Sequence, residues 1–116
     1  MIPDRNRRVG RSIYKLICSL FVDEIYNQYV KDNITITNVE LTKDLKIAKI
    51  FFITKDNNLN KSVSELEKLK PFFKKKIADE INLKFCPDII FQFDKDEDRA
   101  NRVDDLINKL RKKNLL

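Results

Sequence analysis

The chain has 116 residues, of which 42% are hydrophobic and 36% are charged, and its formal net charge is +6. A single glycine excludes a glycine-rich phosphate loop and a dinucleotide fingerprint. The absence of histidine excludes a His-based catalytic triad and leaves almost no candidate ligands for zinc. We therefore expect a protein that is not an enzyme and uses no metal or cofactor. Its basic balance favours a phosphate-rich partner, although a lysine-rich surface can also serve solvation alone.

Two cysteines and the lack of long apolar runs bear on where the protein works. Cys18 and Cys86 form no Cys-x-x-Cys motif and are expected to be small core residues in a reducing compartment. No apolar run reaches transmembrane length, and the arginine-rich N-terminus lacks the apolar region of a secretory signal. We expect a cytoplasmic protein without a membrane partner, with the stroma or matrix of an organelle as the alternative.

The first long periodic segment predicts an amphipathic helix from Arg7 to about Tyr29. Residues 1–6 are expected to form a flexible arm before a single domain at residues 7–113, and residues 114–116 its C-terminal end. The apolar side of the helix holds Val9, Ile13, Leu16, Ile17, Leu20 and Ile25. The opposite side holds Arg7, Arg8, Arg11 and Lys15. Positive charge near a helix N-terminus opposes the macrodipole, so this placement hints at a charged partner.

The next segment predicts two strands. A turn is expected at Lys31–Asn33, and the alternation in Ile34–Leu41 predicts a strand with a bulge near Asn38, where the apolar phase slips. Leu45–Thr54 predicts a second strand, which the short connection makes an antiparallel partner of the first. Because this second strand is apolar on both faces, we expect it to be central in the sheet or covered on both sides.

A second helix follows the polar segment Lys55–Lys61 and is expected to begin near Ser62 or Ser64, since either serine suits a capping box. Its apolar stripe consists of Val63, Leu66, Leu69, Phe73, Ile77 and Ile81. Pro71 lies within this pattern and is expected to kink or break the helix, because proline cannot donate a backbone N–H and disfavours the helical conformation of Lys70.

The last third of the chain predicts one more strand and one more helix. Ile89–Phe93 follows Pro87 and can lie parallel to one of the first two strands, because a long helical connection precedes it. An acidic turn is expected at Asp94–Asp98, before a final amphipathic helix. The apolar residues of that helix are Val103, Leu106, Ile107 and Leu110. Together these elements predict an α+β fold, with a three-stranded sheet whose helices lie on one face.

Lysines crowd around Pro71 in the second helix. They are Lys68, Lys70, Lys74, Lys75 and Lys76. One interpretation is an RNA-binding surface, in which each lysine neutralises a phosphate and releases counterions. The other is a solvated helix face, which is what charge runs usually provide. A break at Pro71 would add free N–H groups that suit an anion. Tyr14, near the arginines of the first helix, is the tyrosine best placed to stack on a base.

The order of helix, strand, strand, kinked helix and strand, with a C-terminal helix added, resembles a type II KH fold. KH domains bind single-stranded RNA through a Gly-x-x-Gly loop, which a chain with Gly10 alone cannot form. A small basic chain of this kind is similar to the ribosome-binding factor A family. The matching segments are Arg7-Arg8-Val9, the run Ile34–Ile50, the run Leu83–Asp94 and the pair Leu106-Ile107.

This resemblance implies an assembly factor that binds the small ribosomal subunit through 16S-type rRNA, assists late rRNA maturation and leaves before translation. We also expect it to be a monomer when free. In that family an Ala-x-Gly kink replaces the KH loop, and the aligned residues here are Leu69, Lys70 and Pro71. The family's basic surface maps onto Arg7, Arg8, Arg11 and Lys74–Lys76. A protein-interaction adaptor whose basic surface only solvates stays open as the alternative.

Overall fold

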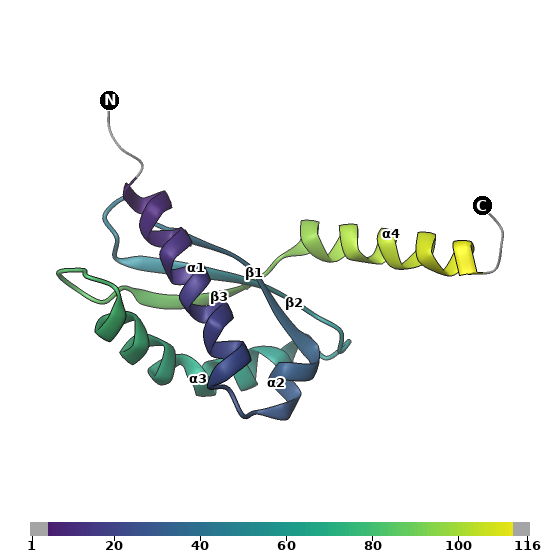
Figure 1. Cartoon of the computed structure of the whole chain (residues 1–116), viewed down its shortest axis with the longest axis horizontal. Coiled ribbons are helices and arrows are strands. Elements are labelled where there is room, and N and C mark those ends of the chain that lie inside the picture. The colour runs from purple at the N-terminus through teal and green to yellow at the C-terminus, as the bar shows by residue number, and fades with distance from the viewer. Residues whose placement is uncertain (1–4, 113–116) are drawn as a thin grey trace.

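Four helices and three strands make up residues 5–112, the part of the chain that this computed structural model describes (Figure 1). They are α1 (Arg5–Asp23), α2 (Gln28–Asn33), β1 (Ile34–Leu41), β2 (Ile47–Thr54), α3 (Leu59–Glu80), β3 (Asp88–Phe93) and α4 (Lys95–Lys112). The strands form one sheet in the order β1-β2-β3, in which β2 is antiparallel to β1 and parallel to β3. The predicted α+β architecture, the hairpin and the parallel third strand are confirmed, in the element order expected of a type II KH-like fold.

A bulge interrupts β1, the edge strand next to α1. Its pairing with β2 shifts by one residue between Ile36 and Asn38, so Thr37 is an extra residue in the strand. The predicted bulge near Asn38 is therefore confirmed. Because side chains alternate along a strand, the extra residue returns Val39 and Leu41 to the buried face.

The core lies between the sheet and two helices on one of its faces, with α1 over β1 and α3 over β3 (Figure 1). Phe73 of α3 is fully buried, and its ring centroid lies 6.2 Å from that of Phe21 in α1 and 6.1 Å from that of Phe91 in β3. The other buried hydrophobic residues are Ile13, Ile17, Leu20, Ile25, Val30, Ile34, Ile36, Val39, Leu41, Ala48, Ile50, Phe52, Leu66, Ile77 and Ile89. Phe73 thus ties both helices to the sheet.

The first helical segment is divided in two. The expectation of one helix to about Tyr29 and a turn at Lys31–Asn33 is wrong, because α1 ends earlier and α2 begins after Asn27. The Oδ1 of Asn27 accepts a hydrogen bond from the N–H of Val30 at 3.1 Å, which caps α2. Ile25, between the two helices, is only 2% exposed. The break therefore directs this side chain into the core.

The start of α3 is set by Asn58. Its Oδ1 accepts a hydrogen bond from the N–H of Lys61 at 3.0 Å, so the helix begins inside the polar segment Lys55–Lys61 that was expected to precede it. The expected start at Ser62 or Ser64 is wrong. Ser62 is completely buried, and its hydroxyl makes hydrogen bonds with the side-chain hydroxyls of two neighbouring residues. Ser62 is therefore part of the protein interior, and its side chain does not cap the helix.

Pro71 lies within α3, and the helix does not end there. The expectation of a break with a second helix N-terminus at Pro71 is wrong. A bend at Leu69, Lys70 and Pro71 stays a prediction. Because proline has no backbone N–H, the carbonyl of Glu67 loses its helical partner, which is the usual cause of such a bend.

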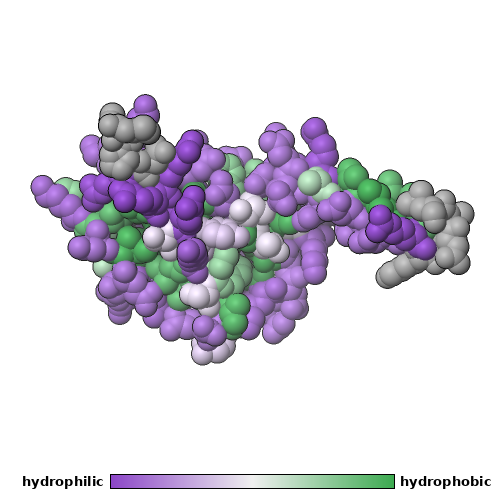
Figure 2. Space-filling model, turned by 45° about the horizontal axis from the view of Figure 1, so that its top comes forward, coloured by the Kyte–Doolittle hydropathy of each residue, from purple (hydrophilic) through white to green (hydrophobic). Residues whose placement is uncertain are grey.

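The last helix, α4, projects away from the sheet (Figure 1). It begins within the acidic turn expected at Asp94–Asp98, because the Asp94 carboxylate accepts a hydrogen bond from the N–H of Glu97 at 3.0 Å. The expectation of a turn over that whole segment is wrong. Val103 and Leu106 of its apolar stripe are 51% and 58% exposed, and apolar atoms show in green along this helix in Figure 2. Two of the four residues in the stripe are therefore exposed to solvent, whereas Ile107 and Leu110 are half-buried.

The structure also bears on the cysteines, on the start of α1, and on membrane spans and metal sites. Cys18 is half-buried and Cys86 is exposed, so the prediction of a core residue is wrong for Cys86. α1 starts at Arg5, two residues before the expected position, and residues 1–4 and 113–116 lie outside the described residues. None of the helices within residues 5–112 is long and apolar enough to cross a membrane. The same range holds no cluster of His, Cys, Asp or Glu suited to a metal ion.

Candidate nucleic-acid interface

Gly10 allows α1 to lie directly on the bulged end of β1. It is buried, and a Cβ atom at this position would lie 2.9 Å from the carbonyl oxygen of Val39. Any side chain would therefore push the helix away from the strand. One helical turn earlier, the side-chain amide of Asn6 donates a hydrogen bond to the carbonyl of Leu41 at 3.4 Å. These two contacts fix the N-terminal half of α1 against β1.

A groove of about 610 Å³ opens beside this contact, and we call it the arginine groove. It is lined by Asn6, Arg7, Arg11, Tyr14, Asn38, Val39, Glu40 and Leu41. Two of the four basic residues predicted on the first helix, Arg7 and Arg11, thus share one cavity. The other two, Arg8 and Lys15, are exposed on α1 outside it.

The groove combines positive charge with a neutral aromatic ring. Arg11 makes no ion pair or hydrogen bond with any described residue, so its guanidinium is available to a ligand. Glu40 is the one acidic residue among those that line the groove. The side-chain hydrogen bond with Cys18 holds the pKa of the Tyr14 phenol above its ordinary value, so this ring is uncharged at neutral pH. Guanidinium groups bind phosphate, and a neutral ring can stack on a base.

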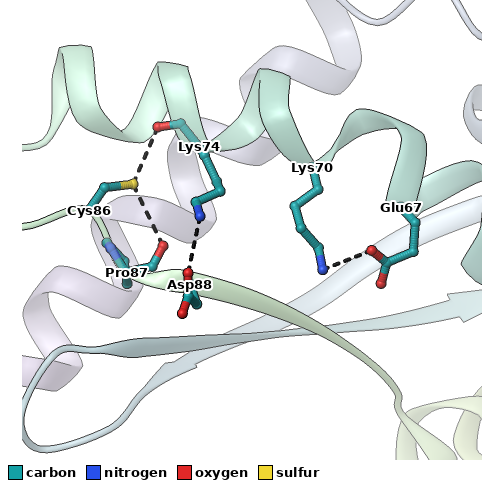
Figure 3. A network of polar contacts seen from close by, with 6 residues as sticks. All are labelled: Glu67, Lys70, Lys74, Cys86, Pro87 and Asp88. Carbon is teal, nitrogen blue, oxygen red and sulfur yellow. Dashed lines mark hydrogen bonds and ion pairs between the residues drawn. The ribbon is translucent and has the colours of Figure 1, made fainter.

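The five lysines around Pro71, which we call the lysine cluster, lie in a different electrostatic setting. Lys70 pairs with Glu67, and Lys74 pairs with Asp88 at the start of β3 (Figure 3). The Nζ–O distances of these pairs are 2.8 Å and 3.1 Å. The Nζ of Lys70 also lies 5.9 Å from the ring centroid of Phe91. These two lysines therefore extend along the β3 side of α3 and are already paired.

The rest of the cluster is paired in the same way, with one exception. Lys68 lies 3.3 Å from Glu65 on the same helix, and Lys76 lies 3.0 Å from Glu24. The hydrogen bond to that glutamate raises the pKa of Lys76 above its ordinary value, although burial partly opposes it. Lys75 is exposed and makes no ion pair within residues 5–112. A phosphate that approaches the cluster must compete with carboxylates of the protein itself.

The two basic regions lie at opposite edges of the sheet. The arginine groove borders β1, the lysines Lys70 and Lys74 border β3, and β2 separates the two strands. The structure therefore does not unite the predicted basic residues into one positive surface. It brings Arg7 and Arg11 together and leaves most of the lysines neutralised.

Sequence reasoning missed several residues that shape these regions. Asn38 and Glu40 line the arginine groove, yet they were considered only as strand residues. No local signal identifies them, because their position depends on how Gly10 seats α1 on β1. The pairing of Lys68 and Lys70 had a visible signal, since each follows a glutamate by three residues, a spacing at which helical side chains meet.

Comparison with known proteins gives a consistent result over nearly the whole chain. The model of the family described as ribosome-binding factor A matches residues 5–107. The ribosome-binding factor A of Macrococcus caseolyticus is 34% identical over 112 residues, which cover 91% of this chain and 94% of that protein. The ribosome-binding factor A of Caldicellulosiruptor saccharolyticus is 31% identical, with 92% and 82% covered.

Solved structures show the same fold. The crystal structure of ribosome-binding factor A from Thermus thermophilus superposes with a TM-score of 0.65 at 12% identity, covering 82% of this chain and 97% of that one. A solution structure of a Thermotoga maritima protein, a candidate ribosome binding factor A, gives a TM-score of 0.69 at 28% identity, covering 82% and 92%. With the family model spanning most of the chain, this protein belongs to the ribosome-binding factor A family.

Proposed function

We propose that this protein is a ribosome assembly factor that binds the small ribosomal subunit through 16S-type rRNA and assists late rRNA maturation. It acts without catalysing a reaction and without a cofactor. It is a monomer when free, and it works in the cytoplasm. Family membership supports this assignment, because the relatives are named for binding the ribosome.

The observation that carries the proposal is the uncompensated positive charge on α1. Arg8, Arg11 and Lys15 have no ion pair with any residue in the range 5–112. Positive charge near the N-terminus of a helix destabilises that helix. Its presence here is therefore better explained by binding to a phosphate. RNA supplies that partner, since each arginine that neutralises a phosphate releases condensed counterions.

The lysine cluster and the bend at Leu69, Lys70 and Pro71 have a secondary role in this proposal. Lys75 contacts phosphate directly, whereas Lys68, Lys74 and Lys76 exchange their internal carboxylates for phosphates when RNA binds. Such exchange yields little net free energy, because exposed ion pairs and phosphate contacts are of similar strength. The cluster therefore adds less affinity than its charge suggests.

Sedimentation with purified small subunits tests the proposal. The protein should travel with free small subunits at low salt and dissociate steadily as the salt concentration rises. Simultaneous Arg8→Gln and Arg11→Gln substitutions should weaken this association and reduce its salt dependence. The proposal is wrong if the protein does not bind small subunits at low salt, or if its binding does not change with salt concentration.

A protein-interaction adaptor is the second candidate, and one observation favours it. Val103 and Leu106 on the projecting α4 are more than half exposed, which suits an apolar partner. Under this alternative, Val103→Ser with Leu106→Ser abolishes partner capture, while the substitutions on α1 leave it intact. Under the rRNA-binding proposal the order of effects is reversed.

A further inference from the structure

The connection between α1 and α2 holds the most exposed aromatic side chain among the described residues. Tyr26 is 86% exposed, and its hydroxyl makes no hydrogen bond with any residue in the range 5–112. The ring therefore contributes little to the core. We propose that Tyr26 stacks on an unpaired base of single-stranded RNA, while Lys68 and Lys76 of the lysine cluster bind the phosphates on either side of that base. This inference deepens the proposed function, on which it rests.

The backbone at Tyr26 is held from both sides. Ile25 is only 2% exposed and is part of the core, and Asn27 caps α2 through its Oδ1. The side-chain amide of Asn27 also donates a hydrogen bond to Glu65 of α3 at 3.0 Å. Because both neighbours are fixed, only the few rotatable bonds of the tyrosine side chain must be ordered when a base stacks on it. The affinity lost to ordering is therefore small.

Two contacts place this connection alongside α3 (Figure 1). The carboxylate of Glu24, before Tyr26, lies 3.0 Å from the Nζ of Lys76. The residue after Tyr26 binds Glu65, whose carboxylate also lies 3.3 Å from the Nζ of Lys68. The two lysines are just over two helical turns apart, about 12 Å along the axis of α3. They therefore flank the connection from its two ends.

Stacking supplies the affinity that the lysine cluster lacks. Lys68 and Lys76 must leave their carboxylates before they bind phosphate, so their charge alone adds little net affinity. Stacking needs no charge, and every base has a flat face, so the ring adds affinity without selecting a sequence. RNA fits this combination better than a protein partner does, because each nucleotide presents a phosphate and a flat base together.

The other two tyrosines of the chain are less suited to stacking. Tyr14 is half-buried, and its hydroxyl is hydrogen-bonded to Cys18. Tyr29 is also half-buried, and the Nζ of Lys61 lies 4.5 Å from the centroid of its ring. The sequence favoured Tyr14 because it lies near the arginines of α1, whereas exposure favours Tyr26.

Fluorescence anisotropy with the full chain tests the site. The two probes are a short single-stranded RNA of uridines and the same strand paired with its adenosine complement. Tyr26→Ala should weaken binding of the single strand about tenfold, which is within the range for the loss of one base–aromatic stack. Binding of the duplex should change by less than about twofold, because its bases are already stacked and paired. Tyr26→Phe keeps the ring and should bind both probes like the unmodified protein.

The proposal is overturned if Tyr26→Ala leaves binding of the single strand unchanged, since the exposed ring would then serve a protein partner or none. Salt provides a second readout. Tyr26→Ala should lower affinity by the same factor at low and at high salt, because stacking releases no counterions. A loss that disappears at high salt would contradict stacking.

Phe85→Ala is a matched control for the removal of an exposed ring. Phe85 is 74% exposed and lies in the connection between α3 and β3. Its replacement should weaken binding of the single strand by less than about twofold. Equal losses in Phe85→Ala and Tyr26→Ala would show that any exposed ring of this protein attracts RNA, and would overturn the site.

The flanking lysines have a control of their own. Lys68→Gln with Lys76→Gln removes two charges beside Tyr26, and Lys95→Gln with Lys109→Gln removes two exposed charges from α4. The first pair should weaken binding of the single strand at least about twofold more than the second pair does. Equal weakening would overturn the placement of phosphates beside Tyr26.

These results separate the Tyr26 site from the proposed function. Loss of single-strand binding in Tyr26→Ala, in a protein that does not travel with small subunits, would support the site and rule out the ribosomal role. Association with small subunits, without any effect of Tyr26→Ala on single-strand binding, would support the role and overturn the site. The two proposals therefore do not fail together.

Discussion

The arginine groove and the lysine cluster are both basic, but they differ in how much of their positive charge is available to a ligand. In the groove, Arg11 pairs with no residue in the range 5–112, and the seat of the helix depends on the close approach at Gly10. In the cluster, Lys70 and Lys74 are held by carboxylates 2.8 Å and 3.1 Å away. The density of positive charge along the sequence is higher in the cluster, yet the charge that a ligand can use is greater in the groove.

The difference has a simple physical origin. Lys68 and Lys70 each follow a glutamate of the same helix by three residues, and their flexible chains reach those carboxylates. Lys74 and Lys76 reach carboxylates on neighbouring elements. The arginines lie on α1, whose first turn contains no acidic residue. A cluster of basic residues therefore marks an interface only where the fold leaves the charge uncompensated.

The largest effect is expected from removing the aromatic anchor that holds α3 to α1 and β3. Phe73→Ala should lower the free energy of unfolding by about 3–5 kcal/mol, because the ring is fully buried and contacts Phe21 and Phe91. Urea denaturation measures this change. Phe85→Ala, at a side chain that is 74% exposed, is the control and should change stability by less than about 0.5 kcal/mol. Similar losses in both variants would contradict the described core.

A smaller loss is expected at the contact that seats α1. Gly10→Ala should lower the free energy of unfolding by about 1–3 kcal/mol, because the new Cβ meets the Val39 backbone carbonyl, which cannot move aside easily. Helix propensity alone predicts the opposite sign, a gain of about 1 kcal/mol. Ser12→Ala, on the exposed side of α1, is the control that reports propensity without the clash. A stabilised Gly10→Ala protein would show that α1 does not press on β1.

A lysine of the cluster should contribute more to RNA binding once its carboxylate partner is removed. Glu67→Gln frees Lys70 and should strengthen RNA binding about two- to threefold at low salt. Stability should change by less than about 1 kcal/mol, because both side chains of the pair are partly exposed to solvent. Asp104→Asn on α4 makes the same change in net charge far from the cluster, and it should have a smaller effect on binding. Equal gains in the two variants would mean that only net charge matters.

The smallest effect concerns pH at the start of α3. The hydroxyl of Tyr29 donates to Asp56 at 2.7 Å and the N–H of Asn58 donates at 3.0 Å, and these bonds hold the pKa of this carboxyl below its ordinary value. The unfolded chain therefore binds a proton at this site more readily than the folded chain. The contribution is fully present above about pH 4 and is lost as pH falls through the folded pKa.

Asp56→Asn removes the titrating group and tests this dependence. Urea midpoints measured at about pH 5 and about pH 3 should differ less in this variant than in the unmodified protein. The arginines of α1 do not titrate in this range, so their RNA binding should not follow Asp56. An unchanged pH dependence would show that the hydrogen bonds of Asp56 do not stabilise the fold.

Periodicity predicted most of this architecture, because the strands and long helices are amphipathic on the scale of one element. The bulge near Asn38 followed from a slip in alternation, and the parallel third strand from the length of the connection. The starts of α2 after Asn27 and of α3 after Asn58 were not predicted. Asparagine caps were visible at both sites, but choosing between Asn58 and Ser62 requires knowing that Ser62 is buried.

The candidate site was predictable only in part. Charge and helical spacing identified Arg7 and Arg11. The availability of that charge depends on distances between elements, which a sequence does not contain. The same holds for Glu24, which pairs with Lys76 across 52 positions of the chain, and for Asn38 and Glu40, which reach the groove only through packing.

The bulged end of β1 also protects the protein from its own neighbours. An edge strand with free backbone groups can recruit a strand from another molecule and begin aggregation. Here the side chain of Asn38 occupies the N–H of Val39, and the side chain of Asn6 occupies the carbonyl of Leu41. The extra residue Thr37 disturbs the regular spacing that an incoming strand would need. This half of β1 is consequently a poor template for intermolecular sheet growth, a benefit at the high concentrations at which proteins are made and stored.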